Sequence, residues 1–296
     1  MNLDDIDTRL YEELQRDGRA SMETLARVVG LSRVAARARV TRLVESGTVR
    51  VVGIVHPSTQ ELRAFAHLSL TVDGSALEVG RRIADMDTVP LVSVVTGRAA
   101  LVAEARATST VALREVTSEI ASVPGVLHVE STLYTERVKD VFAPPTAVVP
   151  TEIDATDRQI LDALSADGRV SYAEIARRTH FSSSAIRGRV HHLMSRGVVR
   201  VTAVVTPGMV GLQHMCGFGL RLHKDTESEA IASIASLDAV SYLSLTLGRW
   251  DAIGTLLVKT QSELVSELDR VRATPGIEAL ESWSHLDVLK VDHSLS

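Results

Sequence analysis

The chain contains one sequence pattern twice, and this internal repeat constrains its fold more than any other feature. Residues 3–57 align without a gap with residues 153–207, and 21 of the 55 aligned positions are identical. Farther along, TGRAALV (96–102) aligns with LGRWDAI (247–253). A period near 150 residues is much longer than a solenoid repeat, so it predicts one two-domain unit in two tandem copies. Between the copies, FAPPTAVVPT contains three prolines and no charge, which predicts a stiff linker over 141–152.

The first part of each copy has the apolar spacing of short helices. In the third helix of each copy, the residues expected to face the core are Ala36, Val40, Leu43, Ile186, Val190 and Leu193. Ser32 and Ser182 precede these helices and are their predicted N-caps. A β-rich run follows each helix, at VRVVGIV (49–55) and VRVTAVV (199–205). This order predicts winged helix-turn-helix domains over 1–57 and 153–207.

The second part of each copy alternates strands and helices. Strands are predicted near 64–72, 89–96, 99–106, 126–134, 214–223, 240–247, 251–259 and 277–289. Helices are predicted near 76–86, 108–121, 227–236 and 261–272. The βαββαβ order is that of a ferredoxin-like domain, here over 64–140 and 213–292. The fold class is therefore α+β, and each sheet has one face that helices leave uncovered. Gly217 and Gly219 predict close packing of a strand against a neighbour.

The net charge of −5 hides two strongly basic segments. Residues 27–50 carry six arginines and one acid, and residues 177–200 carry six arginines and no acid. A helix that follows the turn of a helix-turn-helix enters the major groove, where arginine binds guanine or phosphate. We expect DNA contacts from Ser32, Arg33, Arg37, Arg39, Thr41, Arg42, Arg50, Ser182, Ser183, Ser184, Arg187, Arg189, His191 and Arg200. Arg39 and Arg189 flank the core face, so a structural ion pair is the alternative for both.

The helical parts resemble the N-terminal domain of the Lrp/AsnC (leucine-responsive, feast/famine) transcription regulators. The shared features in the first copy are Asp7, Leu14, Asp17-Gly18-Arg19, Leu25-Ala26, Leu31-Ser32, Arg39-Val40, Leu43 and Gly47. The βαββαβ parts resemble the ligand-sensing domain of that family, through Gly248-Arg249-Trp250-Asp251 in particular. The resemblance implies an intramolecular pseudo-dimer that binds double-stranded DNA. It also implies a small effector, often an amino acid, and further assembly of chains through the sensor domains into a dimer or tetramer of pseudo-dimers.

The two copies differ from the family pattern in ways that make them unequal. Val34 stands where Ser184 keeps the usual serine, and the first copy has no acid at the turn Gly97-Arg98-Ala99-Ala100. We therefore expect an asymmetric DNA site and a better effector site in the second copy. The predicted effector contacts are Gly97, Arg98, Gly248, Arg249, Trp250 and Asp251. Turn capping is the alternative role for Asp251.

Two other classes of function compete with a DNA-binding regulator. The architecture also resembles the sirohaem decarboxylases, but these need a pocket rich in histidine and tyrosine, and aromatic residues make up only 3% of the chain. A protein that only binds other proteins is a third possibility, because the sheets have apolar faces. The histidines show no metal-ligand spacing and Cys216 is the single cysteine. We expect no enzyme activity, no metal, no other cofactor and no membrane partner, and a cytoplasmic location.

Overall fold

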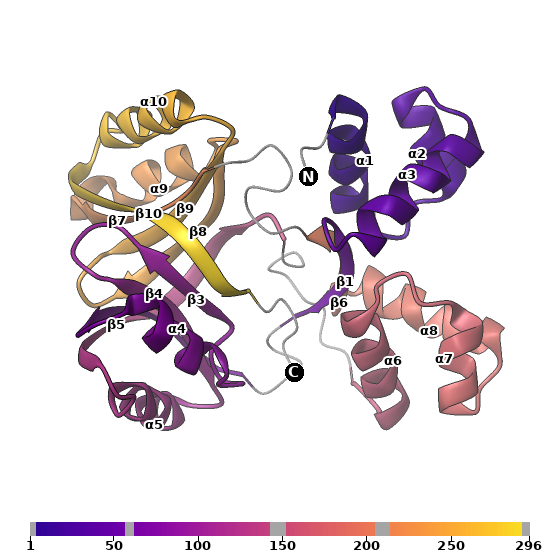
Figure 1. The fold of residues 1–296 in the computed structure, drawn as a ribbon, viewed down its shortest axis with the longest axis horizontal. Helices are drawn as coiled ribbons and strands as arrows, with labels where there is room; N and C mark the ends of the chain where they lie inside the picture. Colours follow the sequence, from indigo (N-terminus) through magenta and orange to yellow (C-terminus); the bar gives the residue numbers. More distant parts are fainter. Residues whose placement is uncertain (1–3, 57–61, 143–151, 205–213, 292–296) are drawn as a thin grey trace. The chain divides into compact units, whose positions relative to one another are not determined.

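The computed structural model describes residues 4–56, 62–142, 152–204 and 214–291, and it divides into two compact units. The helix-turn-helix unit contains the first part of both copies, within residues 1–60 and 142–211. The barrel unit contains the second part of both copies, within residues 61–141 and 212–292. Equivalent parts of the two copies therefore pack together, as expected for a pseudo-dimer made from one chain. Figure 1 shows both units.

Each copy contributes three helices and one strand to the helix-turn-helix unit. In the first copy they are α1 (Asp5–Arg16), α2 (Met22–Val29), α3 (Arg33–Glu45) and β1 (Arg50–Val55). In the second copy they are α6 (Ala155–Ala166), α7 (Tyr172–Thr179), α8 (Ser183–Ser195) and β6 (Val199–Val204). The predicted caps form, because the Ser32 and Ser182 hydroxyls accept the backbone N–H groups of Ala35 and Ala185. All six predicted core residues of α3 and α8 are buried.

The β-ribbon after the third helices is shared by the two copies. β1 and β6 pair antiparallel with each other, with Arg50 opposite Val204 and Val55 opposite Val199. Two glycines of the first copy lie very close to the second copy, where a side chain would not fit. A Cβ atom on Gly18 would lie 2.9 Å from the Thr202 backbone nitrogen, and one on Gly53 would lie 2.8 Å from Leu164 Cβ. One continuous apolar core joins both copies, so the two domains form a single packed unit.

The barrel unit is built from two ferredoxin-like halves. The first half contains β2 (Ala64–Val72), α4 (Ala76–Ala84), β3 (Leu91–Val95), β4 (Leu101–Ala107), α5 (Thr110–Ala121) and β5 (Val126–Asp140). The second contains β7 (His214–Leu222), α9 (Glu227–Ala235), β8 (Val240–Leu247), β9 (Ala252–Val258), α10 (Gln261–Arg272) and β10 (Ile277–Val291). A short 3-10 turn, η2 (Lys224–Thr226), precedes α9. The elements agree with the predicted order, although β5 continues to Asp140, beyond its predicted end near 134.

The edges of the two sheets join to form a closed barrel of order β10-β3-β4-β2-β5-β8-β9-β7. β5 pairs with β8 and β10 pairs with β3, so neither half has an unpaired edge. Two lysines support these seams reciprocally. Lys139 Nζ donates to the Leu237 carbonyl at 2.8 Å, and Lys290 Nζ donates to the Met86 carbonyl at 2.8 Å. The sheet faces without helices therefore line the barrel interior and cover each other.

The predicted close packing at Gly217 and Gly219 is confirmed. A Cβ atom on Gly217 would collide with the indole of Trp283, and one on Gly219 would lie 2.6 Å from the indole of Trp250. Two tryptophans thus fill space that these glycines leave open. Most of the predicted linker, residues 143–151, lies outside the described residues. Within the described parts of the chain, no helix has the length and apolar character needed to cross a membrane.

Candidate functional site

The third helix of each helix-turn-helix domain presents a polar face to solvent. On α3 this face includes Arg33, Arg37 and Thr41, and on α8 it includes Arg187 and His191. No described residue forms a hydrogen bond or ion pair with the side chains of these five, and Ser183 and Arg50 are exposed in the same way. Ser182 and Ser184 hydroxyls lie 3.0 Å apart at the start of α8. The three arginines, Thr41 and His191 are therefore able to contact a ligand without first breaking an internal contact among the described residues.

Three of the predicted DNA contacts instead hold the first and third helices together. Arg39 Nη1 lies 2.6 Å from Asp4 Oδ2 and 2.9 Å from Asp7 Oδ1, and Arg42 also binds Asp7. In the second copy, Arg189 Nη1 lies 2.8 Å from a carboxylate oxygen of each of Asp154 and Asp157. The hydrogen bond from Arg39 lowers the pKa of Asp4. The ion-pair alternative therefore describes Arg39 and Arg189, and it extends to Arg42.

Arg200 also has an internal partner. It lies on β6, and its Nη2 donates to the Gln15 carbonyl at 3.2 Å. Arg50, its equivalent on β1, is exposed. The two strand arginines therefore have different surroundings although the sequence gives them the same position in the repeat.

Arg19 and Arg169 have a role that sequence reasoning missed. Arg19 donates to the Gly168 and Val170 carbonyls at 2.7 and 3.0 Å, and Arg169 donates to the Gly18 and Ala20 carbonyls at 2.7 and 3.1 Å. Each arginine therefore bridges from one copy to the other. The aspartates of the repeated Asp-Gly-Arg have a local role, because Asp17 and Asp167 are the C-cap residues of α1 and α6. The presence of an arginine at the equivalent position of both copies is the sequence feature that could have indicated this role.

The predicted effector residues of the two copies meet within the barrel unit. Arg98, Arg249 and Trp250 line one cavity, together with Glu281 and Trp283. The cavity has a volume of about 20 Å³, which is room for one water molecule. Its charges neutralise one another. Arg249 binds Glu281 at 3.0 Å and lies 3.8 Å from Glu130, which Arg98 also binds.

The turns that carry these residues need glycine, and Asp251 supports one of them. The φ angles of Gly97 and Gly248 are 101° and 148°, which residues with a Cβ rarely adopt. Asp251 accepts the Leu222 backbone N–H at 2.9 Å and lies 3.0 Å from Arg221 Nη1. Its carboxylate is therefore already used within the second copy, in the turn-stabilising role considered as the alternative.

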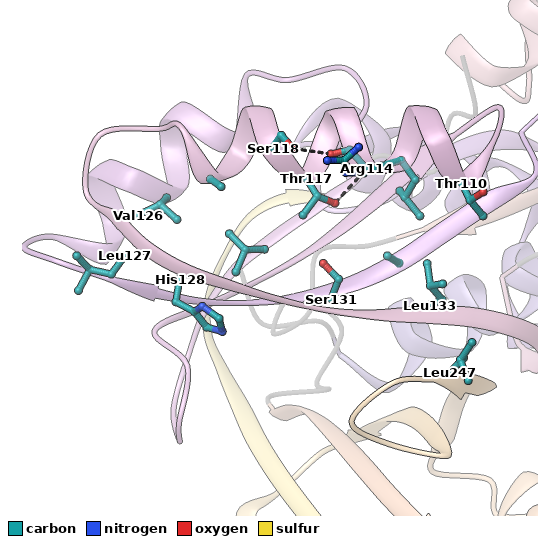
Figure 2. Close-up of a pocket in the computed structure, with 14 residues that line it drawn as sticks. Thr110, Arg114, Thr117, Ser118, Val126, Leu127, His128, Ser131, Leu133 and Leu247 are labelled. Carbon is teal, nitrogen blue, oxygen red and sulfur yellow. Dashed lines mark hydrogen bonds between the residues drawn. The ribbon is translucent and has the colours of Figure 1, made fainter.

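A larger groove lies on the outside of the barrel unit, between α5 and β5 (Figure 2). Its volume is about 710 Å³, within the usual range for small-molecule sites. Its lining residues are Ala66, Thr110, Leu113, Arg114, Thr117, Ser118, Ala121, Val126, Leu127, His128, Val129, Ser131, Leu133 and Leu247. We call it the α5/β5 groove. None of these residues was predicted as a site from the sequence. The alternation of apolar and polar residues in β5 does not show that α5 leaves part of the strand uncovered.

The barrel interior contains several titratable groups. Tyr134 Oη donates to Glu104 Oε1 at 3.0 Å, and the Tyr134 ring meets the Tyr242 ring edge-on at 5.7 Å. Burial raises the pKa of Glu104 to about 7. Burial, and to a lesser degree the neighbouring His285, lowers the pKa of His67 to about 4. Among the described residues no cluster of metal-ligating side chains is present.

Comparison with known proteins places these features in a family. The model of the AsnC-type helix-turn-helix domain matches residues 3–44 and 153–194, and that of the Lrp/AsnC ligand binding domain matches residues 63–143. An uncharacterized HTH-type transcriptional regulator of Pyrococcus horikoshii is 30% identical over 147 residues, which cover 46% of this chain and 93% of that protein. Regulatory protein AsnC of Escherichia coli is 30% identical over 143 residues, covering 47% and 91%.

A solved structure matches almost the whole chain. The siroheme decarboxylase NirDL superposes with a TM-score of 0.68 over 97% of this chain and 93% of that one, at 17% sequence identity. At this identity the likeness shows the fold alone. It confirms that tandem helix-turn-helix and ferredoxin-like domains form one known architecture.

Proposed function

Because the chain belongs to the Lrp/AsnC family of transcription regulators, as two fused copies, we propose that it binds a specific DNA sequence through α3 and α8 and that a small effector modulates this binding. The observation that carries the proposal is the pair of exposed arginine-bearing faces on two helices of one packed unit. In this geometry each helix reads one half-site through the major groove.

The exposed residues and the internally paired ones have different proposed roles. Arg33, Arg37 and Arg187 contact bases or phosphates, since each is an exposed cation on the outer face of its helix. Arg39 and Arg189 act through position, because they fix α3 and α8 to the preceding helices. Among the remaining predicted contacts, the support is stronger for Thr41, Arg50, Ser183, Ser184 and His191, which are exposed. It is weaker for Arg42, which binds Asp7, and for Arg200, which donates to the Gln15 carbonyl.

The two helices are unequal, which supports an asymmetric DNA site. α3 presents two exposed arginines, Arg33 and Arg37, where α8 presents Ser183 and Arg187. Thr41 on α3 corresponds to His191 on α8. An Arg-rich face favours guanine, whereas serine and histidine discriminate less strongly. We therefore propose a site with one stringent and one tolerant half.

We propose that the effector acts through the barrel unit. That this effector is an amino acid bound at the Gly97 and Gly248 turns stays a prediction. The paired charges of Arg98, Glu130, Arg249 and Glu281 offer both signs that an amino acid needs. A cavity of about 20 Å³ has to open before it admits one. The sirohaem decarboxylase alternative has support from the fold alone.

Fluorescence anisotropy with labelled duplex from upstream of the gene tests the DNA part. The informative variant replaces Arg33, Arg37 and Arg187 by Ala together. The control replaces Arg81, Arg270 and Arg272, which are exposed cations of the barrel unit, and changes the net charge equally. We expect a loss of at least 100-fold in affinity for the first and little change for the control. Equal affinities for the two variants would show that α3 and α8 are not the readers.

A further inference from the structure

The α5/β5 groove has an apolar floor and a polar rim without acid. Leu113, Val129 and Leu133 contribute to the floor, and Leu113 is buried beneath α5. No Asp or Glu is among the described residues that line the groove. Figure 2 shows Arg114 on the helix side and His128 on the strand side. The lining therefore combines an apolar surface with a cation and an imidazole.

The hydroxyl groups of the rim differ in whether their protons are already used in hydrogen bonds within the protein. Thr117 Oγ1 donates to the Leu113 carbonyl and Ser118 Oγ to the Arg114 carbonyl, both at 2.9 Å. These protons are used within α5. Ser131 on β5 is exposed and its hydroxyl has no partner among the described residues, and the same holds for the Arg114 guanidinium. The groove thus offers hydrogen-bond donors and a positive charge, which is the complement of an anion.

This character is confined to the first copy. β5 and α5 match β10 and α10 at a constant offset of 151 residues. The residue equivalent to Arg114 is Val265, and the residue equivalent to His128 is Ala279. Asp269 stands where the first copy has Ser118. The second copy therefore lacks the cation and has a carboxylate at the position of Ser118, so one anion site is expected per chain.

We propose that the α5/β5 groove binds a small monocarboxylate with an apolar chain and without an ammonium group, and that this compound is the effector. The effector role rests on the proposed function. Arg114 binds the carboxylate, His128 and Ser131 donate further hydrogen bonds, and the floor covers the chain. An ammonium group would lose water without a carboxylate to pair with, so the matching amino acid binds less tightly. The groove has a volume of about 710 Å³, whereas the cavity at the turns has about 20 Å³.

Calorimetric titration of the full chain with three matched probes tests the proposal. Isocaproate has the carboxylate and a branched chain, L-leucine adds an ammonium group to the same skeleton, and isocaproamide removes the charge. We expect one isocaproate per chain and at least 10-fold weaker binding of the other two. Arg114→Gln should weaken isocaproate binding at least 10-fold, while Arg81→Gln, an exposed arginine of α4, should not change it. Equal binding to the two variants, or tighter binding of L-leucine, would overturn the proposal.

A second measurement distinguishes a ligand site from a contact between chains. Leu127 and Leu247 of the groove lining are 67% and 66% exposed, so Leu127→Asp and Leu247→Asp should fold normally. If these variants alter the sedimentation coefficient and no probe binds the parent protein, another copy covers the groove and the ligand proposal is wrong. Carboxylate binding is measured without DNA. Specific DNA binding without any carboxylate binding would refute only the groove proposal, and the reverse would refute only the DNA proposal.

Discussion

Arg37 and Arg39 lie two residues apart on α3 but have opposite surroundings. Arg39 lies 2.9 Å from an oxygen of Asp7, whose side chain is 4% exposed, whereas Arg37 extends into solvent. Two arginines of one helix thus serve different purposes: one fixes the helix and the other is available to DNA. The same division separates Arg189 from Arg187 on α8.

Arg39→Ala should lower the free energy of unfolding while Arg37→Ala should not. Removing Arg39 leaves the buried Asp7 carboxylate with Arg42 as its remaining cation, so we expect a loss of about 1–3 kcal/mol. Arg37→Ala should change stability by less than about 0.5 kcal/mol, as usual for an exposed position. Urea denaturation of both variants measures the difference. Similar midpoints for the two would contradict the assigned roles.

Arg19 and Arg169 should be needed for the pairing of the two helix-turn-helix domains. Each makes two charge-assisted hydrogen bonds to carbonyl groups of the other copy, so we expect each Ala variant to lose about 1–2 kcal/mol. Hydrogen exchange of the β1 and β6 amides should accelerate in these variants. Arg16→Ala, whose side chain is 77% exposed, is the control. Unchanged amide exchange in a variant that carries both Arg19→Ala and Arg169→Ala would show that the β1–β6 ribbon alone maintains the pairing of the two domains.

Gly217→Ala should destabilise the barrel unit, because the new methyl group would overlap the Trp283 indole. We expect a loss of about 1–3 kcal/mol from overpacking. Gly188 on α8 is the matched control, since a methyl group added there would meet no neighbouring atom within 4 Å. Gly188→Ala should instead stabilise by roughly 0.5–1 kcal/mol through helix propensity. Thermal unfolding of both variants tests the contrast, and a stabilising Gly217→Ala would refute the packing argument.

Glu104 should make stability fall as the pH rises. Its pKa is about 7 in the folded protein and 4.5 ordinarily, so the stabilising effect of its neutral form is complete below pH 4.5 and lost as the pH rises through 7. The loss is at most on the order of 3 kcal/mol. Glu104→Gln should therefore gain stability relative to the parent protein as the pH increases from 5 to 8.

His67 and His285 should act in the opposite direction. Burial lowers the pKa of each to about 4, so their contribution is present above pH 6.5 and is lost as the pH falls toward 4. His67→Phe should weaken the acid-side loss of stability. Melting temperatures across this range measure both effects. If the parent protein and Glu104→Gln show identical pH profiles, the carboxyl group does not titrate near neutrality.

The sequence predicts helices and strands well where apolar periodicity is strong. It predicts poorly which residues far apart in the chain form contacts with one another. β8 (Val240–Leu247) and α10 (Gln261–Arg272) have the predicted bounds. Periodicity places Arg39 beside the core face but does not identify Asp7, 32 residues away, as its partner. Glu104 and His67 alternate with buried residues as a solvent-exposed face would, and only closure of the barrel buries His67 and partly covers Glu104. The pairing of β1 with β6 likewise depends on contacts between copies.

A salt titration of DNA binding by the full chain, measured by anisotropy, tests directly whether α3 and α8 recognise a specific DNA sequence. Duplex from upstream of the gene is compared with a scrambled duplex of equal length. We predict tighter binding to the upstream duplex and a linear fall of log affinity with log salt, from release of counterions. Replacing Arg33, Arg37 and Arg187 by Ala should reduce that slope by up to about 3 and abolish the preference. Equal affinity for both duplexes, or no binding at about 50 mM salt, where phosphate contacts alone should suffice, would contradict specific DNA recognition by α3 and α8.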